Sequence, residues 1–145
     1  MVVIDASVLV ADIRPEEPHH AEARTFLQRA ASEGWAIYLP ALDSIVLPEI
    51  AAAISRGTGD PILARRFVAA VQRIPHYDIL PVLRDLSELA ADLAAEYRIR
   101  GCDAVYVALA QQHGATLITL DRQQRERVPP SIVARSPAEA LSELA

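Results

Sequence analysis

The sequence predicts a three-layer α/β fold in which a mostly parallel sheet is flanked by helices. Short β-branched, apolar segments alternate along the chain with longer segments of helical periodicity. A hydrophobic content of 52% across 145 residues is enough for one continuous core. No repeat, low-complexity tract or linker divides the chain, so residues 1–145 are expected to form a single domain.

The expected elements follow from periodicity and from cap and turn residues. We expect strands at residues 2–4, 36–39, 77–82, 116–120 and 132–134. We expect helices at residues 7–12, 19–33, 44–57, 61–74, 85–97, 102–113 and 137–144. The residues after Asp121 are expected to form a polar turn.

Composition restricts the class of protein. The 14 basic residues are all arginine, and 19 acidic residues bring the net charge to −5, which argues against nonspecific nucleic-acid binding. Cys102 is the only cysteine, so no internal disulfide forms and a reducing compartment is the simpler expectation. No apolar run approaches the roughly 18 residues of a membrane span, and no signal-peptide pattern is present. We therefore expect a cytoplasmic protein.

Isolated carboxylates interrupt segments that otherwise resemble core: Asp5, Glu49, Asp103 and Asp121. Burying an ionised carboxylate is costly, so each needs a hydrogen-bonding cap, a counter-charge or a metal. We expect no basic residue one helical turn away on the same element. Asp5 and Asp103 could also be simple N-caps and Asp121 a turn residue, whereas Glu49 has no such structural explanation.

The predicted topology brings these carboxylates together. Asp5 and Asp121 end strands, and the carboxyl edge of a parallel sheet is where ligands bind. Asp103 begins a helix, and Glu49 is expected to lean over the same edge. Two carboxylates about 4 Å apart repel by roughly 4 kcal/mol at an effective dielectric of 20, and a divalent cation removes that repulsion. Ligands that are all oxygen suit Mg²⁺ or Mn²⁺.

Four segments that carry these acids resemble the motifs of PIN domains. They are residues 3–10 (VIDASVLV), 47–54 (LPEIAAAI), 100–110 (RGCDAVYVALA) and 117–121 (LITLD). The third is the most specific. Their order and spacing are similar to those of VapC-like toxins from bacterial and archaeal toxin–antitoxin pairs, and the resemblance covers essentially the whole chain.

The resemblance implies a sheet of order 3-2-1-4-5 and Mg²⁺- or Mn²⁺-dependent endonucleolytic cleavage of RNA, leaving a 5′-phosphate and a 3′-hydroxyl. It implies Asp5 and Asp103 as direct metal ligands, with Glu49 and Asp121 completing the site directly or through water. Ser7 and Thr119 would orient carboxylates or water. It also implies a homodimer and an antitoxin that places a basic side chain into the acidic pocket. Residues 122–126 lack an aspartate that some relatives carry, which puts a second tightly held metal in doubt.

An acidic site repels RNA, so positive groups must hold the substrate. Arginines that fall near the predicted edge are candidate phosphate contacts, with ordinary solvated surface charges as the alternative. They are Arg98, Arg100, Arg122, Arg125 and Arg127.

Other classes of function remain to be compared. A receiver-like phosphoacceptor or a phosphatase also uses strand-end aspartates and Mg²⁺, but typically needs a lysine, which this chain lacks. A PIN-like module that binds RNA or a partner without cutting is the remaining alternative. Cys102 is expected to be a small packed residue, and Tyr106 a core residue.

Overall fold

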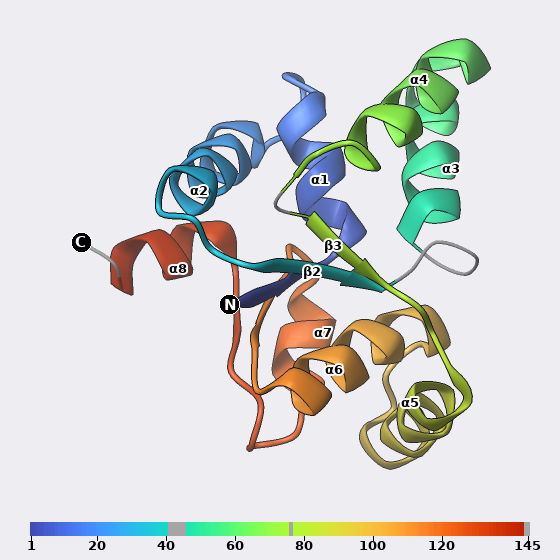
Figure 1. Cartoon of the computed structure of the whole chain (residues 1–145), viewed down its shortest axis with the longest axis vertical. Helices are drawn as coiled ribbons and strands as arrows, with labels where there is room; N and C mark the ends of the chain where they lie inside the picture. The colour runs from blue at the N-terminus through green and yellow to red at the C-terminus, as the bar shows by residue number, and fades with distance from the viewer. Residues whose placement is uncertain (41–45, 76, 144–145) are drawn as a thin grey trace.

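A computed structural model describes residues 1–40, 46–75 and 77–143 (Figure 1). The strands are β1 (Val2–Ile4), β2 (Ile37–Pro40), β3 (Tyr77–Leu80), β4 (Thr116–Ile118) and β5 (Ala134–Arg135). The helices are α1 (Ala6–Ile13), α2 (His20–Ser32), α3 (Val46–Thr58), α4 (Pro61–Val71), α5 (Arg84–Tyr97), α6 (Gly101–His113), α7 (Arg122–Arg127) and α8 (Pro137–Glu143).

The strands form one sheet of order β3-β2-β1-β4-β5, which confirms the predicted order. Every neighbouring pair of described strands is parallel, so the sheet is parallel throughout and not merely for the most part. Val3 of β1 pairs with Tyr38 of β2, and Ile4 pairs with Ile118 of β4. β1 and β4 therefore end level with each other, and the segments that follow both strands emerge at the same edge.

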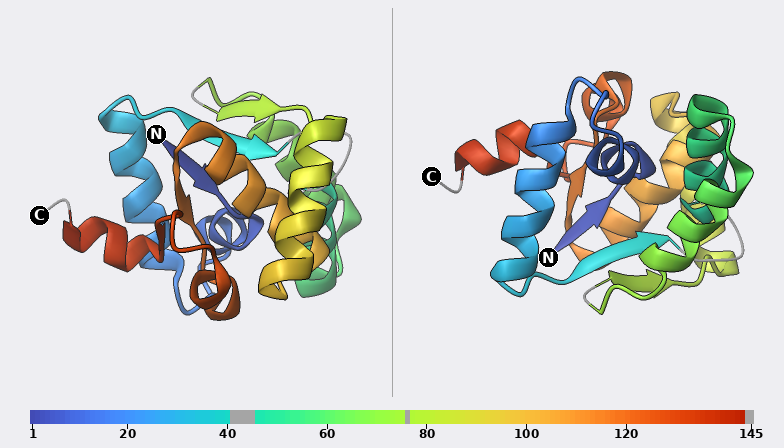
Figure 2. Two further views of the ribbon diagram at one scale, coloured as in Figure 1. Left: turned by 90° about the horizontal axis from the view of Figure 1, so that it is seen from below. Right: turned by 90° about the horizontal axis from the view of Figure 1, so that it is seen from above.

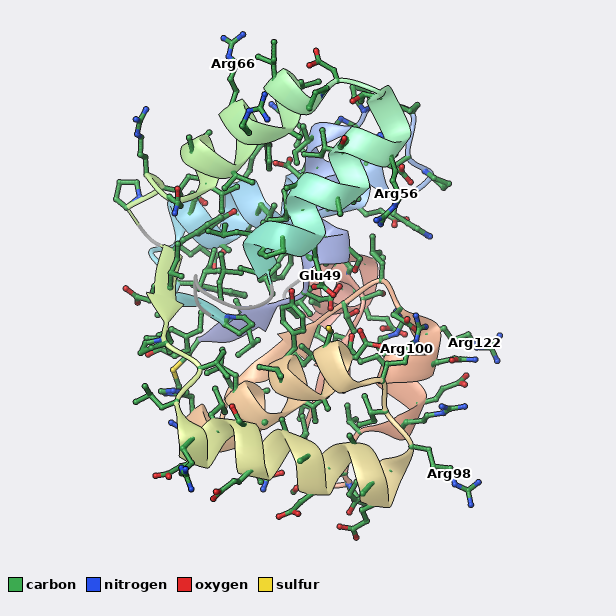
Figure 3. All side chains as sticks on the ribbon, turned by 90° about the vertical axis from the view of Figure 1, so that its right-hand side faces the viewer. Glu49, Arg56, Arg66, Arg98, Arg100 and Arg122 are labelled. Atoms are coloured by element: carbon green, nitrogen blue, oxygen red, sulfur yellow. The ribbon has the colours of Figure 1, made fainter. Side chains whose placement is uncertain are left out.

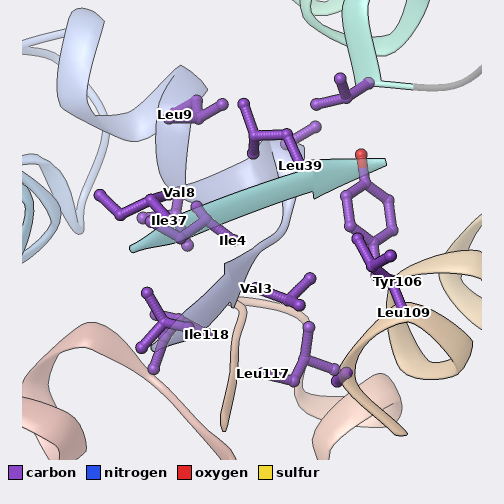
Figure 4. Packing of buried hydrophobic residues seen from close by; sticks show 14 of the residues in the cluster. Val3, Ile4, Val8, Leu9, Ile37, Leu39, Tyr106, Leu109, Leu117 and Ile118 are labelled. Carbon is purple, nitrogen blue, oxygen red and sulfur yellow. The ribbon is translucent and has the colours of Figure 1, made fainter. Parts of the chain in front are cut away.

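Helices cover both faces of the sheet, as Figures 1 and 2 show. α1 to α4 lie on one side, and α5 and α6 lie on the other. All three residues of β1 are buried as a result, which is typical of a parallel strand at the centre of a three-layer fold. Figure 4 shows the two halves of the core, with Val8 and Leu9 on one side of the sheet and Leu109 and Leu117 on the other.

The region after β4 differs from the prediction. β4 ends at Ile118, two residues earlier than expected. The N–H of Thr119 still donates to the carbonyl of Arg135 on β5 at 3.0 Å, but the next two N–H groups bond to side chains. The N–H of Leu120 donates to Oγ of Ser7 at 3.2 Å, and the N–H of Asp121 donates to Oγ1 of Thr119 at 3.0 Å. The predicted polar turn is wrong, since these residues form the six-residue helix α7.

Smaller differences concern element ends. β3 stops at Leu80 and α4 at Val71, both earlier than predicted. β5 is Ala134–Arg135 and begins two residues later than predicted. Ile132 is buried, but the pairing with β4 starts only at Ala134. The predicted helix start at residue 44 and helix end at residue 144 lie outside the described residues. None of the helices in the described segments has the length and apolar character that crossing a membrane requires.

Candidate active site

Asp5 lies between β1 and α1 and is 7% exposed. Its Oδ1 accepts a 2.8 Å hydrogen bond from the backbone N–H of Ser7, so it is the N-cap of α1. Burial raises the pKa of this carboxyl to about 6, while hydrogen bonds from Ser7 lower it. The charges of Glu49 and Asp103 raise the pKa further. Asp5 is thus both the helix cap considered above and an electrostatic neighbour of two other candidate acids.

Glu49 lies in the first turn of α3 and is half-buried. Its partner comes from another element, because the hydroxyl of Tyr106 on α6 donates to Oε2 at 2.7 Å. Burial raises the pKa of Glu49, the hydrogen bond from Tyr106 lowers it, and the charge of Asp103 raises it. These contacts agree with the expectation that the partner of Glu49 is not one of its neighbours along α3.

Asp103 lies in the first turn of α6, but the N-cap of that helix is Arg100, so the N-cap interpretation of Asp103 is wrong. Burial raises the pKa of Asp103, Arg100 lowers it, and the charge of Asp121 raises it. Nε of Arg100 lies 3.5 Å from Oδ2 of Asp103. The expectation of no basic residue one turn away is therefore also wrong, because α6 begins earlier than predicted and places Arg100 beside the acid.

Asp121 is the N-cap of α7. Its Oδ1 accepts hydrogen bonds from the backbone N–H groups of Gln123 at 2.7 Å and Gln124 at 3.2 Å. Its Oδ2 accepts one from Nη2 of Arg100 at 2.9 Å. Arg100 thus bridges Asp121 and Asp103, which belong to two different sequence motifs.

The two predicted supporting hydroxyls lie just beyond the ends of β1 and β4, Ser7 in α1 and Thr119 directly after β4. Ser7 hydrogen-bonds Asp5 through its side chain and its backbone N–H, and its Oγ also accepts from the N–H of Leu120. Thr119 is fully buried, and its Oγ1 accepts from the N–H of Asp121. These hydroxyls therefore fix the chain segments that carry Asp5 and Asp121.

The donor chemistry at this edge suits a hard divalent cation. Asp5, Glu49 and Asp103 offer carboxylate oxygens, and each of the three has a pKa raised by the charge of another acid. Among the described residues, however, no group of three or more His, Cys, Asp or Glu side chains is close enough together to hold a metal ion. The residues fit such an ion by chemistry, and their side chains must move closer together to bind it.

Most of the candidate arginines make intramolecular contacts. Arg122 pairs with Glu126 at 2.6 Å, Nη1 of Arg125 donates to the carbonyl of Thr119 at 2.9 Å, and Nη1 of Arg127 donates to the carbonyl of Arg98 at 2.7 Å. Figure 3 shows Arg98, Arg100 and Arg122 on the same side of the molecule as Glu49. Arg100 is bound to Asp103 and Asp121, and contact of these arginines with RNA stays a prediction.

A cavity of about 730 Å³ adjoins Glu49 between α1 and α3. Its lining includes Glu49, Ala52, Ala53 and Arg56, which lie on one face of α3 at helical spacing. Cys102 also lines it and is exposed, so the prediction of a packed cysteine is wrong. The first turn of α6 directs this side chain into the cavity instead of the core.

Sequence reasoning missed two residues of this region. Tyr106 is a core residue as predicted, at 0% exposed, but its bond to Glu49 was not foreseen. Its spacing of three residues from Asp103 in an apolar helix was the available signal. Arg56 was overlooked as a basic residue near the site, although it lies seven residues, or two turns, after Glu49.

The chain combines a three-layer α/β fold with acidic residues at the carboxyl edge of its sheet, and it also matches the model of a known family. The PIN-domain family model matches residues 2–128, and the chain belongs to the PIN-domain family. The resemblance inferred from the four motifs is thereby confirmed.

Solved structures share the fold. FitAcB from Neisseria gonorrhoeae has a TM-score of 0.72 at 18% identity, covering 95% of this chain and 99% of that one. VapC20 from Mycobacterium tuberculosis, a toxin that cleaves the sarcin–ricin loop, has a TM-score of 0.71 at 18% identity, covering 87% and 94%. VapBC2 from Rickettsia felis, bound to promoter DNA, has a TM-score of 0.70 at 17% identity, covering 94% and 98%. No curated protein matches the chain.

Proposed function

We propose that the chain is a Mg²⁺- or Mn²⁺-dependent endoribonuclease and the toxin of a toxin–antitoxin pair. The observation that carries this proposal is the buried carboxylate of Asp5, whose pKa is raised to about 6 beside Glu49 and Asp103. These three acids come from distant segments of the chain and share no common counter-ion among the described residues. A site for a divalent cation requires such a group of carboxylates. The structural similarity of this chain to VapC20, a toxin that cleaves the sarcin–ricin loop, supports RNA as the substrate.

In this proposal Asp5 and Asp103 hold the cation directly, and Glu49 and Asp121 complete the site. A bound divalent cation lowers the pKa of a water molecule and offsets charge on the phosphate oxygens. Ser7 and Thr119 keep the segments that carry Asp5 and Asp121 in place. Arg98, Arg100, Arg122 and Arg125 are the proposed phosphate contacts. We propose a single PIN domain over residues 1–145, acting on RNA in the cytoplasm.

Asp103→Asn tests the activity. The amide keeps the size of the side chain and removes its charge, so the variant should fold but lose cleavage of defined RNAs to the level of an EDTA control. Asp92→Asn, an exposed position on α5, is the matched control and should cleave like the wild type. Full activity of Asp103→Asn in Mg²⁺ or Mn²⁺ would exclude the assignment.

A second candidate function is binding of RNA or a partner without cleavage. The bridge from Arg100 to Asp103 and Asp121 favours it, because a paired arginine can replace a cation as the counter-charge. A protein of this kind would bind the same RNAs but leave them intact in both Mg²⁺ and Mn²⁺. The cleavage assay therefore separates the two functions.

We also propose an antitoxin partner that places a basic side chain against the acids. The negative charges of Asp5, Glu49 and Asp103 provide the complementary surface. Adding such a partner should inhibit cleavage, and truncating its basic side chain to alanine should restore cleavage. Inhibition that survives this truncation would contradict the proposed contact.

Homodimerisation is the remaining proposal for assembly. On α4, Ile62 is 62% exposed and Leu63 is 42% exposed, which leaves apolar surface available for a second copy. Light scattering at micromolar concentration should give twice the 15.8 kDa of the chain, and Ile62→Glu should shift the mass toward that of one chain. A monomeric wild-type mass would contradict the proposal.

A further inference from the structure

The hydroxyl of Tyr106 is a polar group placed deep in an apolar helix. α6 is buried from Ala104 to Ala110, and Tyr106 carries the only polar side-chain atom in that stretch. The residue is 0% exposed. A buried hydroxyl needs a hydrogen-bond partner, and the identity of that partner shows what the group contributes.

The partners of this hydroxyl belong to the proposed cation site. It donates to Oε2 of Glu49 at 2.7 Å, across 57 residues of sequence. The backbone amide of Ala6, which directly follows Asp5, lies near enough to hydrogen-bond the same oxygen. Asp103 lies one helical turn before Tyr106 on α6. One hydroxyl thus connects the three elements that carry Asp5, Glu49 and Asp103.

The ring of Tyr106 holds the hydroxyl in place. Figure 4 shows it beside the end of β2, next to Leu109, with its oxygen directed away from α6. A tyrosine ring has only two side-chain torsions, and packing on all sides leaves it little room to rotate. The hydroxyl is consequently a rigid donor, whereas Glu49 is a long, half-buried side chain in the first turn of α3.

We propose that Tyr106 is a positioning residue that orients the Glu49 carboxylate toward Asp5 and Asp103 and thereby sets the affinity of the site for a divalent cation. The inference rests on the proposed cation site and adds a residue that does not touch the ion. Groups that hydrogen-bond a ligating carboxylate orient it, and their loss typically lowers metal affinity about 10- to 100-fold.

Tyr106→Phe provides the test, because it keeps the ring and removes only the hydroxyl. Titration of the purified protein with Mn²⁺ in a calorimeter should show a dissociation constant at least about 10-fold above that of the wild type. Tyr97→Phe is the matched control, since it removes the same hydroxyl from α5, a helix that carries none of the four acids. This control should bind Mn²⁺ like the wild type.

A double-mutant comparison separates positioning from a merely structural effect. Glu49→Ala removes the group through which Tyr106 acts, so adding Tyr106→Phe to it should weaken Mn²⁺ binding no further. A full additional loss in the Glu49→Ala background, or unchanged affinity of Tyr106→Phe alone, would overturn the inference. If Tyr106→Phe does not fold, Glu49→Asp withdraws the carboxylate from the hydroxyl while keeping its charge. Unchanged Mn²⁺ affinity in that variant would overturn the inference equally.

Mn²⁺ binding by the wild-type protein separates failure of the proposed metal-dependent function from failure of the role of Tyr106. If the wild-type protein binds no Mn²⁺, the proposed metal-dependent function fails, and the role of Tyr106 fails with it. If the wild type binds Mn²⁺ and loses this on Asp103→Asn, but Tyr106→Phe binds normally, only the positioning role fails.

Discussion

At the scale of single residues, Asp5 combines a structural and an electrostatic role in one carboxylate. Its Oδ1 caps α1 through the N–H of Ser7, which stabilises the start of the helix. Burial beside Glu49 and Asp103 raises its pKa from 3.8 to about 6, so its charge destabilises the folded protein at neutral pH. The cap explains why Asp suits this position, and the raised pKa indicates that capping is not its whole role.

The raised pKa predicts how stability depends on pH. Because the folded state holds the proton of Asp5 more tightly than the unfolded chain, this stabilisation is present below pH 4 and is lost as pH rises through about 6. Asp5→Asn should therefore stabilise the protein at pH 8 in EDTA, by up to about 3 kcal/mol, and change little at pH 4. Chemical denaturation at the two pH values measures this.

An exposed N-cap is the matched control. Asp60 caps α4 through the N–H groups of Ile62 and Leu63, and Asp60→Asn should change stability little at either pH. A loss of stability in Asp5→Asn at pH 8 would show that the ionised carboxylate is compensated in the folded state. Mn²⁺ should stabilise the wild type and not Asp5→Asn, because only the folded wild type binds it.

At the scale of elements, α7 holds the fourth acid in place. The helix is only six residues long and is anchored by contacts to neighbouring elements. The side chain of Gln124 is 2% exposed, and its Nε2 donates to the carbonyl of Asp103 at 3.1 Å. Arg125 and Arg127 bond the carbonyls of Thr119 and Arg98. α7 is therefore part of the site framework that joins β4 to α6.

Two substitutions of Asp121 separate its roles. Asp121→Asn keeps an N-cap oxygen, so stability should stay close to wild type while cleavage falls. Asp121→Ala loses the bonds to the N–H groups of Gln123 and Gln124 and should cost about 1 kcal/mol as well as cleavage. Urea unfolding and the RNA assay measure the two effects. Wild-type cleavage by Asp121→Asn would restrict Asp121 to a structural role.

At the scale of the whole molecule, charge distribution decides how an acidic protein holds RNA. The net charge is −5, yet Arg98, Arg100 and Arg122 lie on the side of the molecule that carries Glu49. Local positive groups can bind phosphates although the molecule as a whole repels them. Binding through these groups should weaken as salt rises.

Arg100 provides the test of this surface. In an Asp5→Asn background, which prevents cleavage, Arg100→Ala should weaken RNA binding and reduce the slope of log affinity against log salt by about 0.7. Arg84→Ala, at the opposite end of α5 from Arg98, should leave the slope unchanged. Fluorescence anisotropy over a salt series measures both. An unchanged slope for Arg100→Ala would restrict Arg100 to its pairs with Asp103 and Asp121.

Much of the fold follows from local sequence signals. Apolar strand segments, helical periodicity and cap residues predicted most of the elements and the parallel sheet, because these signals depend on neighbours within about a turn. Asp5, Glu49, Asp103 and Asp121 were identifiable from sequence because a lone carboxylate in an apolar segment needs an explanation. The ends of β4 and β5, and the helix α7, were not predicted, since contacts from distant segments determine them.

The sequence by itself determined the order of the elements other than α7, the family and the set of acids to consider. Only the tertiary structure decided how those acids are paired: Arg100 with Asp103 and Asp121, and Tyr106 with Glu49. The physical reason is distance along the chain. Periodicity and capping act between neighbouring residues, whereas a hydrogen bond across 57 residues exists only once the sheet has brought α3 and α6 together.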